Sequence, residues 1–198
     1  MKVLAFGSEA VIYEKNGIII KRRVKKSYRI REIDEKLRKN RSKAEFNIMR
    51  FLYESGLNVP RPLKYLEERK EIWMEKIEGI RLAEEFSVND AKETGRTVAK
   101  MHNLGIVHGD LTTANIIKRD KKLYIIDFGL SYHSPKDEDF ASDIFLFKNA
   151  LKSKHNDLYK EAYYSFLHAY KSKIRKEFKG IDTHLKDIEE RRRYNESY

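Results

Sequence analysis

Three oxygen-bearing side chains, Asp110, Asn115 and Asp127, have types and a spacing that suit phosphoryl transfer. Asp110 and Asn115 stand five positions apart in an expected loop, and Asp127 follows the short apolar run Leu123–Ile126. One carboxylate can take or orient the proton of an attacking hydroxyl, while the other carboxylate and the carboxamide suit Mg²⁺ beside phosphates. Alternatively, these residues only form turns and end a strand. The Asp110–Asn115 pair and Asp127 follow one another in this order with one hairpin's length of chain between them, which favours the catalytic interpretation.

Composition limits the class of protein. The chain has 198 residues, 40% of them hydrophobic, which is enough for one domain or one two-lobed unit. No run approaches the ~18 apolar residues of a membrane span, and Met1–Gly7 is too short and too soon broken for a secretory signal. Cysteine is absent, which excludes disulfides and fits a reducing compartment. We therefore expect a cytoplasmic protein without a membrane partner. The 42 basic against 31 acidic residues, a net charge of +11, favour a polyanionic partner.

The first part of the chain has the pattern of an antiparallel sheet. Met1–Gly7 and Ala10–Glu14 are expected strands, and Asn16-Gly17 predicts a type I′ hairpin turn into the next apolar strand. On that strand Lys21 shares a face with Ile19, because side chains alternate. The strand could therefore bring an ammonium to a phosphate and aliphatic carbon to a base. The alternative is a lysine at a strand end whose stem packs along the surface.

Two helices separated by a break at Asn40–Ser42 are predicted between Ile30 and Gly56. The first helix has apolar residues on one stripe and the second has another. These stripes consist of Ile30, Ile33 and Leu37 in the first helix and Ala44, Ile48, Phe51 and Leu52 in the second.

Glu45 borders the second apolar stripe, where an unpaired carboxylate would be costly to bury. Lys21 is the candidate partner. The competing interpretation is a capping box, in which Glu45 reaches back to the backbone of Ser42. The ion pair is favoured because a phosphate-binding lysine in this type of site requires such a glutamate.

A second hairpin, Leu63–Glu67 with Glu71–Lys76, leads through Gly79 into the rest of the chain. We expect this passage to join two lobes, residues 1–78 and 79–198. A nucleotide base bound at this joint would form hydrogen bonds with the main chain. The fold class is thus expected to be α+β, with a small β-rich first lobe and a reduced helical second lobe.

The second lobe is expected to begin with a helix over Asn89–Leu104, capped by Asn89 and ended by Gly105. Two more helices follow Ser134-Pro135, and their apolar stripes are predicted to form core. The residues expected on these faces are Phe140, Ile144, Phe147, Lys148 and Leu151, then Leu158, Ala162, Phe166 and Ala169. Arg191–Arg193 and the residues to Tyr198 are predicted to form a mobile basic tail.

The motifs together resemble those of the PRPK-like kinases of the KEOPS complex, small atypical Ser/Thr kinases related to the RIO kinases. That complex serves the threonylcarbamoyl modification of adenosine in tRNA. The resemblance covers both lobes, and the run Gly105–Thr113 is its most specific part, because other kinases rarely have two threonines there. RIO kinases and aminoglycoside phosphotransferases have similar but distinguishable loops. The matching segments are Gly7–Ala10, Ile20–Arg23, Lys26–Arg29, Arg41–Glu45, Gly105–Asn115 and Ile126–Ser131.

The resemblance implies a role for each matched residue in binding ATP and Mg²⁺. Asp110 would be the catalytic base, and Lys21 the phosphate-binding lysine supported by Glu45. Asn115 and Asp127 would be the Mg²⁺ ligands. Further nucleotide contacts are expected from Gly7, Ser8, Ile12, Ile19, Met74 as gatekeeper, and the backbone of Glu75 and Ile77.

The departures from the kinase pattern matter as well. Ala10 stands where a full glycine-rich loop has its last glycine, so the loop is less flexible. Gly109 replaces the arginine that reads a phosphorylated activation loop, and Thr112 stands where Ser/Thr kinases usually have lysine. The interval from Asp127 to Asp143, a residue that resembles the brace of the catalytic loop, lacks an Ala-Pro-Glu motif and a peptide-docking platform. We infer control by a partner surface rather than by loop phosphorylation.

The resemblance also implies partners. These are the other KEOPS subunits, chiefly the threonylcarbamoyl-transferase subunit of ASKHA fold and a small adaptor. The basic run from Lys21 to Arg31 is either a solvated face or a nucleic-acid edge, and with the basic tail it makes tRNA a candidate partner.

Transfer of the phosphoryl group to a protein and hydrolysis of ATP by water both stay open. Two alternative functions are a small-molecule phosphotransferase of the aminoglycoside or choline type, which usually needs a larger second lobe, and a non-catalytic tRNA-binding scaffold.

Overall fold

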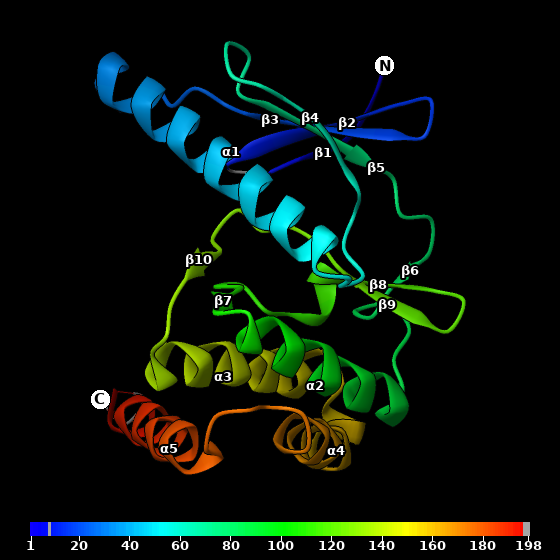
Figure 1. The fold of residues 1–198 in the computed structure, drawn as a ribbon, viewed down its shortest axis with the longest axis vertical. Helices are drawn as coiled ribbons and strands as arrows, with labels where there is room; N and C mark the ends of the chain where they lie inside the picture. Colours follow the sequence, from blue (N-terminus) through cyan, green and yellow to red (C-terminus); the bar gives the residue numbers. More distant parts are fainter. Residues whose placement is uncertain (8, 196–198) are drawn as a thin grey trace. The chain divides into compact units, whose positions relative to one another are not determined.

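The computed structural model describes residues 1–7 and 9–195, which form two units. The first comprises Met1–Glu78 with Asp127–Gly129, and the second comprises Gly79–Ile126 with Leu130–Tyr198. An antiparallel sheet of order β1-β2-β3-β5-β4 forms the first unit (Figure 1). Its strands lie where the sequence predicts them, at β1 (Lys2–Phe6), β2 (Ala10–Lys15), β3 (Ile18–Arg23), β4 (Pro62–Leu66) and β5 (Glu71–Glu75).

The β2–β3 turn fixes which side chains share a face of this sheet. Asn16 and Gly17 have positive φ values of 50° and 74°, as the predicted type I′ turn requires. The resulting register places Ile12 opposite Lys21 and Ile19 opposite Met74. Directly opposed residues lie on the same face, so four of the residues expected around a nucleotide lie on one side of the sheet.

One helix, α1 (Arg31–Glu54), replaces the two helices predicted between Ile30 and Gly56. The predicted break at Asn40–Ser42 is wrong. Ser42 is fully buried, and its hydroxyl lies 3.5 Å from the carbonyl of Lys70, so it packs against the sheet rather than ending a helix.

The stripe that α1 buries also differs from the predicted one. Ile33 and Leu37 are 52% and 36% exposed, whereas Asp34 and Glu45 are almost completely buried. The face of α1 toward the sheet is therefore largely polar in its first turns. Apolar periodicity selected the opposite face there, because it does not anticipate buried ion pairs.

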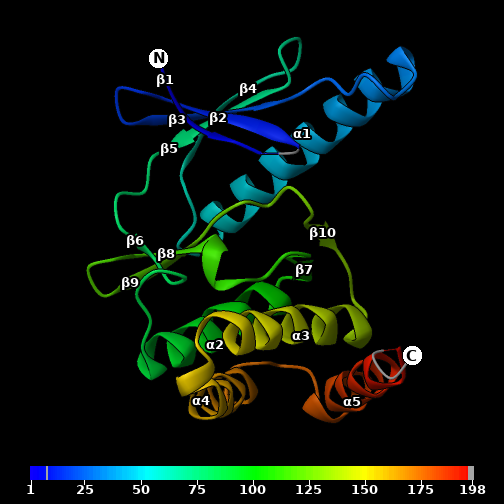
Figure 2. The ribbon, with the colours of Figure 1, turned by 180° about the vertical axis from the view of Figure 1, so that it is seen from behind.

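The second unit combines four helices with short strands (Figures 1 and 2). The helices α2 and α4 lie side by side in both views, and α3 packs on α5. A Cβ on Gly95 of α2 would lie 2.3 Å from the carbonyl oxygen of Phe166 in α4, so only glycine permits this approach. The elements are β6 (Ile80–Arg81), α2 (Val88–Asn103), β7 (Ile106–Val107), β8 (Ile116–Arg119), β9 (Lys122–Ile125), β10 (Tyr132–His133), α3 (Asp137–Lys154), α4 (Tyr159–Lys171) and α5 (Phe178–Asn195), with 3₁₀ turns at Thr113–Asn115 and Asn156–Leu158.

The predicted core of the second unit is largely confirmed. The apolar residues of the α3 stripe are buried, and Lys148 on the same face is half-buried. Ala162, Phe166 and Ala169 of α4 are buried, whereas Leu158, in the 3₁₀ turn before α4, is 38% exposed. The antiparallel pair β8 and β9 supplies the hairpin expected between Asn115 and Asp127. No helix in the described ranges is long and apolar enough to cross a membrane.

The predicted mobile tail is wrong as far as the structure describes it. Residues 178–195 form α5, which buries Ile181 and Leu185. The guanidinium of Arg191 donates to the carbonyl of Asp187, and that of Arg192 lies 5.1 Å from the Phe145 ring centroid. The spacing of apolar residues from 178 to 185 is helical, and this signal was overlooked beside the charged residues. Residues 196–198 lie outside the described ones.

The cap of α2 is Ser87 and not Asn89. The Asp90 N–H donates to the Ser87 hydroxyl oxygen at 3.3 Å, and the Ser87 N–H donates to Asp90 Oδ2 at 2.9 Å, which is a complete capping box.

We expect Ser87→Ala to lower the free energy of unfolding by about 1 kcal/mol, because one helix N–H loses its acceptor. Urea unfolding at constant slope measures this loss. Asn89→Ala is the control and should change stability by less than half as much. An equal loss in both variants would contradict the assignment of the cap.

Candidate active site

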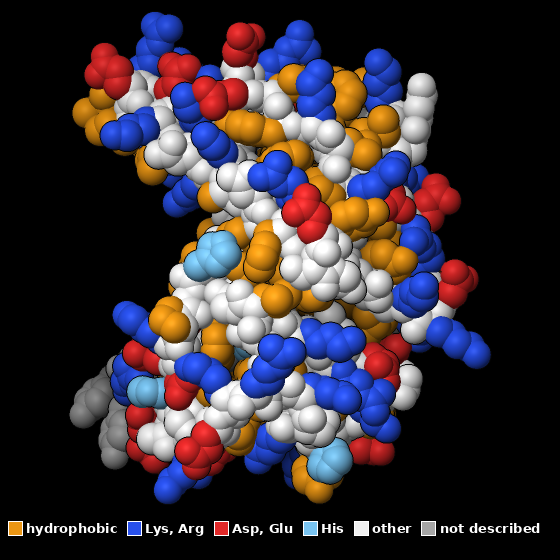
Figure 3. Space-filling model, viewed as in Figure 1, with side chains coloured by type: hydrophobic (Ala, Val, Ile, Leu, Met, Phe, Trp, Pro, Cys, Tyr) orange, Lys and Arg blue, Asp and Glu red, His pale blue; other side chains and the backbone are white. Residues whose placement is uncertain are grey.

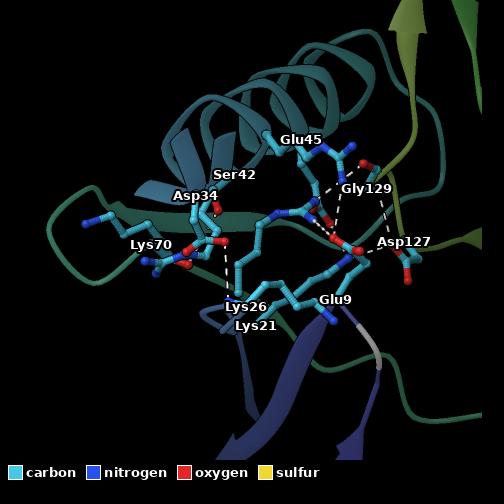
Figure 4. A network of polar contacts seen from close by, with 12 residues as sticks. Glu9, Lys21, Lys26, Asp34, Ser42, Glu45, Lys70, Asp127 and Gly129 are labelled. Atoms are coloured by element: carbon cyan, nitrogen blue, oxygen red, sulfur yellow. Dashed lines mark hydrogen bonds and ion pairs between the residues drawn. The ribbon is translucent and has the colours of Figure 1, made fainter. Parts of the chain in front are cut away.

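Lys21 lies between two carboxylates in the first unit (Figure 4). It is 7% exposed, and its Nζ is 2.6 Å from Glu45 Oε1 and 2.5 Å from Asp127 Oδ1. Strand β3 supplies the lysine and α1 supplies the glutamate. The predicted ion pair of Lys21 with Glu45 is confirmed, and the capping box of Glu45 with Ser42 is not formed, because both residues lie inside one continuous helix.

The charge of Lys21 is secured by these partners. Burial by itself lowers the pKa of this ammonium, but the attraction of Glu45 and Asp127 outweighs burial and raises the pKa above its ordinary value. Lys21 therefore carries a full positive charge at neutral pH in a largely water-excluded position.

Asp127 has an unusual backbone conformation. Its φ of 63° lies in the left-handed region, which aspartate visits rarely. Its Oδ1 also accepts the N–H of Gly129 at 3.2 Å, and the side chain is 49% exposed. Residues in such conformations concentrate at functional sites, where surrounding contacts maintain them.

Asp110 and Asn115 come together in the second unit. Asn115 Nδ2 donates both to the Asp110 carbonyl and to Asp110 Oδ2, each at 2.9 Å. The carboxamide uses its nitrogen for Asp110, and its oxygen is the kind of atom that ligates Mg²⁺. The loop continues without interruption, since the carbonyl of Asn115 accepts the N–H of Ile126, the residue before Asp127.

Asp143 braces the backbone just before Asp110, as the resemblance implied. It is completely buried on α3, and its oxygens accept the N–H groups of His108 at 2.6 Å and Gly109 at 2.8 Å. Burial by itself raises the pKa of Asp143. The hydrogen bond and electrostatic effect of His102, followed by those of His108, outweigh burial and lower this pKa below its ordinary value.

His102 and Tyr170 extend this buried group, and sequence reasoning overlooked both. His102 Nε2 is 3.2 Å from Asp143 Oδ2, and Nδ1 is 2.8 Å from the Tyr170 hydroxyl. Since an ionised carboxylate can only accept hydrogen bonds, His102 Nε2 carries a hydrogen and donates a hydrogen bond to Asp143. A buried histidine on α2 whose polar partners lie 41 and 68 residues further along the chain has no local sequence pattern, so it could not be predicted.

Gly109 explains one departure from the kinase pattern. Its φ is 79°, and a Cβ there would lie 2.5 Å from the carbonyl oxygen of Leu130. Ser131 Oγ also donates to the carbonyl of His108 at 2.8 Å. The chain after Gly129 therefore occupies the place where a larger side chain would stand, which excludes an arginine at position 109 without rearrangement.

The other expected nucleotide residues lie in the first unit. Met74 is 9% and Ile77 is 7% exposed, and the Glu75 N–H donates to the carbonyl of Arg61 at 2.9 Å. The Gly7 N–H closes a turn onto the Ala10 carbonyl at 2.9 Å. Ser8 lies outside the described residues. The roles of these residues in nucleotide contact stay predictions.

The expected metal site uses one carboxylate and one carboxamide. Within residues 1–7 and 9–195, no group of three or more His, Cys, Asp or Glu side chains could hold an ion by itself. The donor types of Asp127 and Asn115 nevertheless suit Mg²⁺, which usually takes one or two protein ligands and completes its shell with water and substrate phosphates. These donor types are compatible with a Mg²⁺ ion bound together with a nucleotide, and the roles of Asp127 and Asn115 as its ligands stay predictions.

Comparison with known proteins agrees with these features. The chain matches the RIO domain family over residues 15–164. The KEOPS complex subunit Bud32 of Pyrococcus abyssi is 40% identical, over 99% of this chain and 97% of its own length. The EKC/KEOPS complex subunit BUD32 of Enterocytozoon bieneusi is 45% identical, over 83% of this chain and 89% of its own. A probable bifunctional tRNA threonylcarbamoyladenosine biosynthesis protein of Methanobrevibacter smithii is 38% identical over 97% of this chain, which matches only 36% of that protein.

A solved structure supports the fold class. The Rio2 kinase of Chaetomium thermophilum, in a complex with ADP, Mg²⁺ and phosphoaspartate, has a TM-score of 0.61 over 96% of this chain and 72% of its own. At 19% identity this likeness shows the fold alone, which is the expected protein-kinase-like α+β fold. By its family match and by relatives that align over nearly its whole length, the chain belongs to the RIO kinase family, in the group of KEOPS complex subunits named Bud32.

Proposed function

We propose that this chain is an ATP-dependent Ser/Thr kinase or ATPase that works as a KEOPS subunit in threonylcarbamoyladenosine modification of tRNA. ATP would supply the γ-phosphoryl group, and Mg²⁺ would neutralise its charge. In this proposal Asp110 orients the attacking hydroxyl or water, Lys21 binds phosphate oxygens, and Asn115 and Asp127 ligate the metal ion.

The observation that carries the proposal is the ammonium of Lys21, buried and fixed between Glu45 and Asp127. A buried ion pair is weak evidence for stability, since apolar residues often stabilise a core as well. It is stronger support for function, because a charged lysine next to a carboxylate with metal-ligand chemistry suits a phosphate group. The expected nucleotide residues Ile12, Ile19 and Met74 share the face of the sheet that carries Lys21.

The proposed partners are the other KEOPS subunits. The Methanobrevibacter smithii relative is named as a bifunctional protein, and this chain matches about a third of it. We infer that the remainder of that protein carries the threonylcarbamoyl-transferase function, and that this chain binds a separate subunit of that type together with a small adaptor.

Binding of tRNA is also proposed, but with fewer residues of the basic run Lys21–Arg31 than the sequence suggested. Within the basic run, Lys21 and Arg23 bind Glu45, Arg22 pairs with Glu71, and Arg29 lies 3.7 Å from Asp34. These contacts neutralise a large part of the run inside the first unit. Lys and Arg side chains are nevertheless distributed over the face in Figure 3, with acidic side chains among them, and Arg191 and Arg192 are exposed on α5.

Release and transfer of phosphate from γ-labelled ATP test the catalytic role. We expect Asp110→Asn to lower turnover by about 10²-fold, because the amide cannot accept the proton of the attacking group. Label on protein and label in inorganic phosphate are counted separately, which distinguishes a kinase from an ATPase.

Asp120→Asn is the matched control. Asp120 is an exposed residue in the β8–β9 turn of the same unit, with a φ of 57° that asparagine tolerates. Its turnover should equal that of the wild type. Equal turnover in wild type and Asp110→Asn would remove Asp110 from the mechanism, and binding of tRNA without any turnover in the assembled complex would favour the scaffold function.

A further inference from the structure

Arg23 is a buried cation that neither the fold nor the proposed chemistry requires by itself. It is 4% exposed and follows Lys21 by two positions on β3, so both side chains lie on the same face of the sheet. Its Nη2 donates to Glu45 Oε2 at 2.7 Å and to the carbonyl of Gly129 at 3.4 Å. Its Nε is buried without a hydrogen-bond partner among the described residues, which is a cost of about 1–3 kcal/mol.

Glu45 thus binds a different cation with each oxygen. Oε1 faces Lys21 at 2.6 Å, and Oε2 faces Arg23 at 2.7 Å. A carboxylate bound by one lysine can rotate about its last torsion, whereas two cations on its two oxygens fix its plane. Arg23 therefore restricts the glutamate on which the position of Lys21 depends.

The same two cations reach the segment that carries the proposed metal ligand. Lys21 binds Asp127 Oδ1 (Figure 4), and Arg23 binds the carbonyl of Gly129, two residues further on. The N–H of Gly129 donates back to Asp127 Oδ1. Two parallel contacts from neighbouring positions of β3 thus fix Asp127–Gly129, which agrees with the strained φ of Asp127.

Arg23 also connects to the glycine-containing loop before β2. Its Nη1 lies 3.8 Å from Glu9 Oε2, and Arg41 Nη1 on α1 donates to the same oxygen at 3.2 Å. Glu9 is thereby tied to α1 and β3 together. These ion pairs restrict the loop, in the same direction as the missing glycine at position 10.

We propose that Arg23 is a positioning residue that assembles Glu45, Lys21 and Asp127 in their reactive arrangement before nucleotide binds. This inference rests on the proposed function, since it assigns Arg23 to the same site. Arg23 acts through its neighbours and touches neither nucleotide nor metal.

Arg22 provides a matched control on the adjacent position. Its side chain lies on the opposite face of β3, where it pairs with the buried Glu71 and stacks over the Tyr13 ring at 5.2 Å. Glu71 also accepts from Trp73 Nε1, so it keeps one partner when Arg22 is changed. Glu45 likewise keeps Lys21 when Arg23 is changed. Both variants therefore remove one of two partners of a buried carboxylate.

The test compares Arg23→Gln, Arg23→Lys and Arg22→Gln in the whole protein. For Arg23→Gln we expect kcat for ATP to fall by about 10–100-fold, because small misplacements of reacting groups have effects of this size. The Kd for Mg²⁺–ADP should change less than about threefold. Arg23→Lys should recover stability but only part of kcat, because an ammonium cannot bind Glu45 and the Gly129 carbonyl as a guanidinium fork does. Arg22→Gln should keep the wild-type kcat.

A second readout does not depend on activity. In ¹⁵N-labelled protein without nucleotide, Arg23→Gln should shift the amide resonances of Asp127 and Gly129, and Arg22→Gln should leave them in place. A kcat within twofold of wild type, equal losses in Arg23→Gln and Arg22→Gln, or unshifted resonances would overturn the role of Arg23. If wild type itself turns over no ATP, the proposed function fails, and the resonances alone decide whether Arg23 positions Asp127–Gly129.

Discussion

Asp127→Ala is expected to lower turnover of ATP by about 10³-fold or more. The change removes a proposed Mg²⁺ ligand, whose effect on developing charge is worth several kcal/mol. It also removes the carboxylate 2.5 Å from Lys21 Nζ, which leaves that ammonium to Glu45 alone. Phosphate released from γ-labelled ATP at saturating Mg²⁺ measures the loss.

Stability should respond much less than activity to this change. The Asp127 side chain is 49% exposed, so its ion pair with Lys21 is partly screened and contributes at most about 1 kcal/mol. Asp157→Ala, at an exposed position in the second unit, is the control and should keep full turnover. Activity that survives in Asp127→Ala, or that is lost only because the variant unfolds, would count against the metal-ligand assignment.

Sequence reasoning succeeded where the signal was local. Asn16-Gly17 specifies a turn whose geometry only a few residues permit, and this turn set the register that places Ile12 opposite Lys21. The apolar stripes of α3 and α4 follow a helical period and were found for the same reason. Local rules of backbone conformation and periodicity need no knowledge of the rest of the chain.

The pair of Lys21 with Glu45 was predictable for a different reason. Neither residue has a local signal that distinguishes it from a surface lysine or a capping glutamate. The requirement came from the downstream carboxylates, because a phosphate site needs a lysine and the lysine needs a counter-charge. Chemistry therefore linked positions that are far apart in the sequence.

Prediction failed where long-range polar contacts decide the structure. The buried stripe of α1 includes Asp34, Ser42 and Glu45. The partners of Glu45 come from β3 and that of Ser42 from the β4–β5 turn, whereas Asp34 pairs with Arg38 of the same helix and with Arg29 just before it. A pattern based on hydrophobicity reads such a stripe as a solvent-exposed face. Arg23 was missed in the same way, since within a basic run it resembles its neighbours and only its partners distinguish it.

Asp143→Asn is expected to lower the free energy of unfolding by about 1.5–3 kcal/mol, because it replaces a buried carboxylate that accepts several hydrogen bonds. Asp143 is completely buried and accepts from His108 N, Gly109 N and His102. The asparagine side chain has one acceptor oxygen, so its amide end would meet a donor of the loop or of His102. At least one buried donor then lacks an acceptor, which adds to the loss.

The dependence on pH identifies the carboxylate as the cause. The pKa of Asp143 is lowered in the folded protein, so its contribution is full above the unfolded value of about 3.9 and disappears as the pH falls through the folded value. The difference in stability between wild type and Asp143→Asn should therefore be constant near neutral pH and shrink in acid. Urea unfolding across this range measures it, with hydrogen exchange of the His108 and Gly109 amides as a local readout.

Asp139→Asn on the same helix is the control for this experiment. Asp139 is only half-buried and accepts from the hydroxyls of Tyr132 and Ser134, so its loss should be about 1 kcal/mol or less. Since the bonds of Asp143 also fix the backbone just before Asp110, turnover should fall in Asp143→Asn even where the protein is fully folded. Normal turnover together with unchanged exchange of the two amides would show that Asp110 is positioned without Asp143.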